Sequence, residues 1–126
     1  MILQGPILIF DKPSCNNFVI PKTCDITIPD KKLPVAWSYD FVNSEMTLGF
    51  AELDVKEDRI VATVESGNEL LKQIMKDRRR ICCGGYFNCV KVKTPYVGLQ
   101  YVLSCTLRGL GLYESGDDFI YLEVKE

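Results

Sequence analysis

Residues 47–64 read TLGFAELDVKEDRIVATV, and this stretch decides the fold class. Apolar residues alternate with small or polar ones on both sides of a charged run from Asp54 to Asp58. Alternation with a period of two is typical of a strand with one buried face. Two such strands joined by a short polar turn form a β-hairpin, so we expect a hairpin here.

Further short β-type runs lie on both sides of this hairpin. They are residues 7–10, 18–20, 26–28, 33–40, 81–92, 96–107 and 119–124, fenced mostly by proline, glycine or charged residues. Gly84 and Gly85 predict a bulge or a close backbone approach within one run. Many short strands favour a closed sheet, which protects strand edges. We therefore expect a mainly β (α+β) fold, a small closed or partly closed β-barrel that residues 1–126 form as a single domain.

One helix is expected beside this sheet, from about Asn68 to about Arg78. Ser66 and Glu69 have the spacing of a capping box, in which each side chain satisfies a free amide at the helix start. The residues that follow place apolar side chains on one helical face, at positions Leu70, Leu71, Ile74 and Met75. That face is expected to pack on the core.

Composition and charge exclude several classes of function. The formal net charge of -2 and pI near 5.2 provide no broad positive field, so nucleic acid is not an expected partner. No run approaches the roughly 20 apolar residues of a membrane span. The apolar residues 1–10 lack the basic start and small-residue cleavage site of a signal peptide, so we expect synthesis in a cytoplasm and no membrane partner.

Six cysteines and no histidine define the candidates for metal and redox chemistry. The cysteines show no C-x-x-C pair, so no metal and no cofactor are expected. Without a secretion signal, reduced thiols are the expected state. Cys82 and Cys83 are neighbours in a predicted strand, where successive side chains point to opposite faces, so one of the two is expected to be more exposed.

Several short motifs follow one another in an order that resembles a known family. They are Phe10-Asp11-Lys12-Pro13 with Asn16-Asn17, then Pro34-Val35-Ala36-Trp37-Ser38-Tyr39-Asp40, Leu48-Gly49, Ile81-Cys82-Cys83-Gly84 and Val102-Leu103-Ser104-Cys105. The order resembles the tailed-phage prohead protease family, whose fold is shared with the herpesvirus assemblins. The resemblance implies a prohead-protease-like barrel.

The departures from this family lie at the catalytic positions. Tyr39 stands in the histidine position, Cys82 in the serine position and Val102 in the position of the acid. A phenol is a poor base at neutral pH, and the chain has no imidazole to activate a thiol. Because such groups act as a unit, losing all three predicts an inactive homologue with no catalytic residue.

The resemblance without the chemistry implies a non-enzymatic virion protein, an auxiliary or decoration (cementing) subunit of the phage capsid. Its expected partners are the major capsid protein and other virion proteins, with homo-oligomerisation left open. The candidate interface residues, placed in predicted loops, are Tyr39, Met46, Leu112 and Tyr113. Two alternatives stay open: a head maturation peptidase with Cys82 as nucleophile, and a small cellular binding module.

Overall fold

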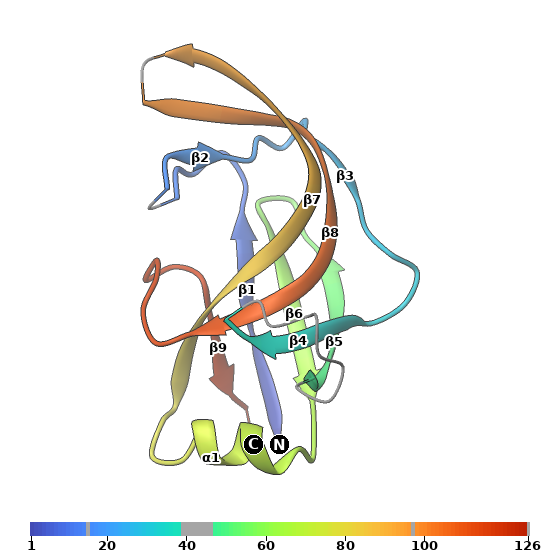
Figure 1. The fold of residues 1–126 in the computed structure, drawn as a ribbon, viewed down its shortest axis with the longest axis vertical. Helices are drawn as coiled ribbons and strands as arrows, with labels where there is room; N and C mark the ends of the chain where they lie inside the picture. Colours follow the sequence, from blue (N-terminus) through green and yellow to red (C-terminus); the bar gives the residue numbers. More distant parts are fainter. Residues whose placement is uncertain (15, 39–46, 97, 126) are drawn as a thin grey trace.

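The computed structural model describes residues 1–14, 16–38, 47–96 and 98–125, which form a mainly β fold with one short helix (Figure 1). In chain order the elements are β1 (Ile2–Ile9), β2 (Phe18–Val19), β3 (Asp25–Thr27), β4 (Leu33–Trp37), β5 (Thr47–Val55), β6 (Arg59–Glu65), α1 (Glu69–Ile74), β7 (Arg80–Tyr96), β8 (Leu99–Tyr113) and β9 (Tyr121–Val124).

Seven of these strands close into a barrel. They pair in the order β8-β4-β5-β6-β1-β9-β7, and the long antiparallel pairing of β7 with β8 completes the ring. The short strands β2 and β3 lie outside the ring and pair in parallel with the first part of β8, whereas β4 pairs with its last part. The predicted mainly β barrel is therefore confirmed.

The hairpin predicted from residues 47–64 is formed by β5 and β6. Phe50 pairs with Glu65 and Val55 with Ile60, across a turn between Lys56 and Asp58. Along β6 the side chains of Ile60, Ala62 and Val64 are buried, while those between them are half-buried. The period-two pattern of the sequence thus places the inner face of this hairpin on the barrel core.

The helix α1 is shorter than predicted and has a different cap. Asn68 is the N-cap residue, and its side chain accepts a hydrogen bond from the Leu71 amide at 3.0 Å. The expected capping box is wrong because the Ser66 hydroxyl donates instead to the Leu48 carbonyl at 2.6 Å. A left-handed residue, Asp77 with φ 63°, follows the helix and prevents its continuation. Figure 1 shows α1 beneath the barrel, at the end where the termini lie.

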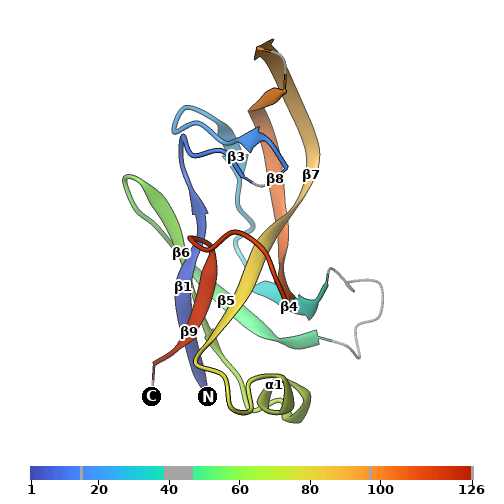
Figure 2. The same cartoon turned by 90° about the vertical axis from the view of Figure 1, so that its left-hand side faces the viewer.

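The second half of the β7–β8 hairpin extends beyond the barrel as an arm, residues 88–96 and 98–107. Figures 1 and 2 show it rising at the end opposite α1 and curving over β2. Val19 of β2 and Val102 and Cys105 of the arm are also buried, although they do not belong to the main core cluster. Apolar burial in this chain therefore extends from the barrel into the base of the arm.

A close contact occurs at Gly85, the second residue of the Gly84-Gly85 pair. A β-carbon built at Gly85 would lie 2.8 Å from the ring of Phe87. The bulge itself falls one residue later, where the β7–β8 pairing shifts between Tyr86 and Phe87. The predicted bulge therefore lies next to the glycine pair, and at Gly85 it is the side chains of Phe87 and Leu107, not another backbone, that leave no room for a β-carbon.

Candidate functional site

A cleft of about 630 Å³ opens on the side of the barrel where β1 and β7 separate. Among the described residues, β9 pairs with β1 at Leu3 and Gln4 and with β7 from Arg80 to Cys82. Beyond β9 the two longer strands continue without a strand between them, and the cleft lies at this split. Its volume is in the range of ordinary ligand and side-chain binding pockets.

Four parts of the chain build the walls of this cleft. They are the end of β1 (residues 7–9), the region around β2 (Lys12, Ser14, Asn16, Phe18 and Ile20), the middle of β7 with the base of the arm, and the β8–β9 connection (residues 113–120). The first two segments are neighbours in the sequence but are far from the other two, so the cleft exists only when the barrel is folded. A site of this kind is rigidly positioned by its scaffold.

The floor of the cleft is apolar and its rim is mixed. Cys83, Val102, Cys105 and Ile120 are buried and line the floor. At the rim the most exposed apolar side chain is Val90, with 43% of its surface exposed.

Charged and hydroxyl groups interrupt this apolar rim. The Lys12 ammonium lies 4.0 Å from the centre of the Phe119 ring, a cation–π contact at the cleft mouth. Ser14, Ser115 and Asp117 add polar groups to the same rim. An apolar centre with a polar rim of both charge signs is the anatomy of a protein–protein contact.

The two thiols in the floor are poorly reactive. Burial raises the pKa of the Cys83 thiol well above its ordinary range, with a smaller contribution from neighbouring Cys82. Burial also raises the pKa of Cys105 to about 12. Because the thiolate is the nucleophile, both side chains act in the floor as small apolar groups.

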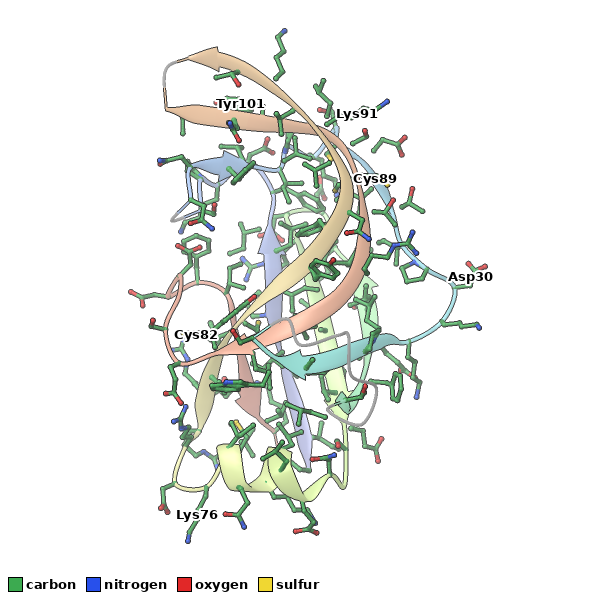
Figure 3. All side chains as sticks on the ribbon, viewed as in Figure 1. Asp30, Lys76, Cys82, Cys89, Lys91 and Tyr101 are labelled. Carbon is green, nitrogen blue, oxygen red and sulfur yellow. The ribbon has the colours of Figure 1, made fainter. Side chains whose placement is uncertain are left out.

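The positions that replace the family's catalytic residues are not brought together. Tyr39 lies outside the described residues. Cys82 is half-buried in β7 opposite Tyr113, whereas Val102 pairs with Val92 in the arm. Val92 follows Cys82 by ten residues, so at about 3.3 Å per residue roughly 30 Å of strand separates the two places. Figure 3 shows Cys82 on the lower part of β7 and Tyr101, the neighbour of Val102, in the arm.

The candidate interface residues have different outcomes. Tyr39 and Met46 fall outside the described residues. The expectation that Leu112 is an exposed loop residue is wrong: it lies in β8, is 0% exposed and belongs to the barrel core. The reason is that the last part of β8 has a strand on each side, β4 and β7, which buries its inward side chains. Tyr113 is half-buried and lines the cleft.

Most cleft residues were missed at the level of sequence. The sequence predicts Phe18 and Phe119 in short extended segments and does not indicate a site for either residue. Both line the cleft. The sequence signal that could have indicated them is an aromatic residue beside a turn-forming segment, where few residues close in sequence can cover the ring. No local sequence signal predicts the separation of β1 from β7, at which Phe18 and Phe119 come to line one cleft.

The comparisons with known proteins identify no relative. No protein-family model, curated protein or solved structure matches this chain. Within residues 1–14, 16–38, 47–96 and 98–125, no group of three or more histidine, cysteine or carboxylate side chains is arranged to hold a metal ion. In that same part of the chain, no helix has the length and apolar character to cross a membrane. The family is therefore not identified, and the site stands on its own geometry.

Proposed function

We propose that this chain is a non-enzymatic structural protein of a tailed-phage head, an auxiliary or decoration subunit that binds capsid protein through the cleft. The observation that carries the proposal is the cleft itself, with a buried apolar floor and a rim of aromatic, aliphatic and charged side chains. The prohead-protease-like fold and the phage origin are parts of the proposal and rest on the sequence motifs.

The character of the cleft supports binding of a polypeptide segment. Its apolar floor would accept a large side chain of the partner, and its rim offers both an ammonium, on Lys12, and a carboxylate, on Asp117. Peptide segments present apolar side chains next to backbone donors and acceptors, so a rim of mixed polarity suits them. Tyr113, a candidate interface residue, is one of the cleft's side chains.

The surroundings of Cys82 support a function without catalysis. Its strand neighbours on either side are Tyr113 and Tyr121, and the chain has no histidine to take a proton from the thiol. A thiol without a base to take its proton is a weak nucleophile at neutral pH. Val102, in the position of the family's acid, lies in the arm.

The test of the structural role is the composition of mature particles. Quantitative mass spectrometry of purified virions of the phage that encodes the chain is expected to detect the intact protein at a copy number comparable to that of capsid subunits. Absence from mature particles would overturn the proposal and favour a cellular binding module.

A second measurement separates this role from that of a maturation peptidase. The purified protein is incubated with capsid and scaffold proteins of the same phage, and we expect no new fragments. New fragments that disappear in the Cys82→Ala variant would show a cysteine peptidase and refute the non-enzymatic role.

A further inference from the structure

The cleft wall formed by the β8–β9 connection, residues 114–120, has an inner and an outer side. Its inner side lines the cleft with Ser115, Gly116, Asp117, Phe119 and Ile120. Glu114 and Asp118 lie beside or between these residues, are exposed, and do not line the cleft. Figure 2 shows the connection passing across β7 before β9 begins. The outer residues of the wall are therefore the ones that other parts of the barrel can hold.

Burial holds only the end of this wall. Ile120 is buried, and its carbonyl accepts a hydrogen bond from the Cys83 amide at 3.5 Å. On the inner side the Phe119 ring lies 4.0 Å from the Lys12 ammonium. Residues 114–116, by contrast, are exposed. Packing on the core does not fix this first part of the wall, so its position depends on polar contacts.

Arg78, which follows α1 in the chain, holds the beginning of the wall. Its Nη2 atom donates to both carboxylate oxygens of Glu114, each at 3.0 Å. The Arg78 side chain is 37% exposed and that of Glu114 is 65% exposed. A pair this exposed adds little to the stability of a whole domain. Its effect is local, because it links the wall to the segment that leads into β7.

Arg80, the first residue of β7, holds the wall at a second place. Its Nη2 atom donates to the backbone carbonyl of Asp118 at 3.0 Å. The guanidinium carbon of the same side chain lies 3.6 Å from the centre of the Tyr121 ring. A planar guanidinium can stack on a ring and donate hydrogen bonds at once, which an ammonium does less well. One side chain thus connects residue 118 with the start of β9.

We infer that Arg78 and Arg80 are positioning residues for the cleft: they hold its β8–β9 wall from the outer side in the arrangement that accepts a partner. Neither arginine lines the cleft. The inference rests on the proposed function in taking the cleft as the binding site. A wall that is ordered beforehand needs no ordering on binding, and a wall that is ordered only part of the time lowers the apparent affinity by that fraction.

The test measures the affinity of the full-length protein for Nile red, a neutral apolar dye, by fluorescence titration. Val90→Asp at the cleft rim should weaken the dye and so locates its binding in the cleft. Arg78→Met and Arg80→Met should each weaken it about two- to fivefold, with the melting temperature within about 3 °C of wild type. Because the dye is uncharged, losing a positive charge does not itself change its attraction to the protein.

Arg79→Met is the matched control within the same basic run. Arg79 is exposed, and its backbone carbonyl accepts from the Val124 amide at 2.9 Å, a contact that a side-chain substitution leaves in place. This variant should bind the dye as wild type does.

A charge exchange tests whether the arginine acts through its partner. Glu114→Arg alone places two cations together and should weaken the dye as Arg78→Met does. Arg78→Glu combined with Glu114→Arg restores an opposite-charge pair and should recover most of the lost affinity. Added salt screens an exposed ion pair, so the ratio of the wild-type affinity to that of Arg78→Met should fall toward one as NaCl is raised to about 1 M.

The inference is refuted if wild type does not bind the dye, if both arginine variants bind it as wild type does, or if Arg79→Met loses as much affinity as they do. A loss in the arginine variants without one in Val90→Asp would place their effect outside the cleft and also refute it. Failure of the charge exchange to restore affinity would refute the role of the Arg78–Glu114 pair. Wild-type protein that binds the dye but not assembled shells would overturn the proposed function and leave the positioning role standing.

Discussion

The two halves of the barrel differ in how the strands β1 and β7 are connected to each other. Near α1 these strands are bridged by β9, and Leu122 of β9 is completely buried between them. Toward the arm nothing comparable joins them in the described chain, and the cleft lies in their place. Leu122 of the bridge is a member of the main apolar core, whereas the cleft of the split half has an exposed apolar side chain, Val90, in its lining.

The difference indicates that one half of the barrel provides stability and the other provides the binding surface. Apolar burial supplies most of the stability of a small domain, so the bridged half should determine the free energy of unfolding. Exposed apolar side chains contribute little to folding and are suited to contacts with a partner. Substitutions in the two halves should therefore separate stability from binding.

The largest effect is expected from Leu122→Ala. Removing a completely buried leucine side chain from the bridge leaves a cavity and should lower the free energy of unfolding by about 3 kcal/mol. Urea denaturation followed by circular dichroism measures this. The control is Leu103→Ala in the arm, where the side chain is 52% exposed and the loss should be at most about 0.5 kcal/mol. Equal losses at the two leucines would contradict the division between the halves.

A smaller loss is expected from Gly5→Ala, where β1 meets β9. A β-carbon at Gly5 would collide with the backbone carbonyl oxygen of Tyr121, so the two strands would have to separate. We expect a loss of about 2 kcal/mol in thermal or urea unfolding. Gly67→Ala is the matched control, because a β-carbon there meets no atom within 4 Å. A Gly5→Ala variant as stable as Gly67→Ala would show that the β1–β9 contact is not tight.

The smallest of the stability effects concerns the cap of α1. Asn68→Ala removes the acceptor for the Leu71 amide and should lower the free energy of unfolding by about 1 kcal/mol. Gln73→Ala, an exposed substitution within the same helix, should change it little. If Ser66→Ala instead produced loss of helix signal while Asn68→Ala did not, the assignment of the cap would be wrong.

Periodicity predicted those parts of the fold that depend on local pattern. The β5–β6 hairpin, the last strand and the position of the helix follow from alternation and apolar spacing over a few residues. The helix start does not follow from the pattern, because Ser66 and Asn68 could each serve as the cap. The hydrogen bond from Ser66 to the Leu48 carbonyl decides in favour of Asn68. That contact joins residues 18 apart and leaves no local signal.

The site was much less predictable than the fold. Leu112 and Tyr113 were expected in a loop, but pairing with β4 and β7 places them in the last part of β8. The cleft depends on where β9 stops bridging β1 and β7, which is a property of strand lengths and pairing and not of any motif. Tyr113 is the candidate interface residue that lines the cleft, together with side chains from parts of the chain more than 20 residues away.

The most direct test of the central claim, that the split half binds the capsid, compares two valine substitutions. Val90→Asp places a carboxylate at the cleft rim, and Val55→Asp makes the same change at the exposed β5–β6 turn, where the valine is 54% exposed. Both variants should keep the wild-type free energy of unfolding within about 0.5 kcal/mol. In cosedimentation with assembled shells of the same phage, Val90→Asp should lose at least about tenfold in affinity, while Val55→Asp should bind as wild type. Wild-type occupancy of the shells by a folded Val90→Asp, or an equal loss in both variants, would contradict the cleft as the binding surface.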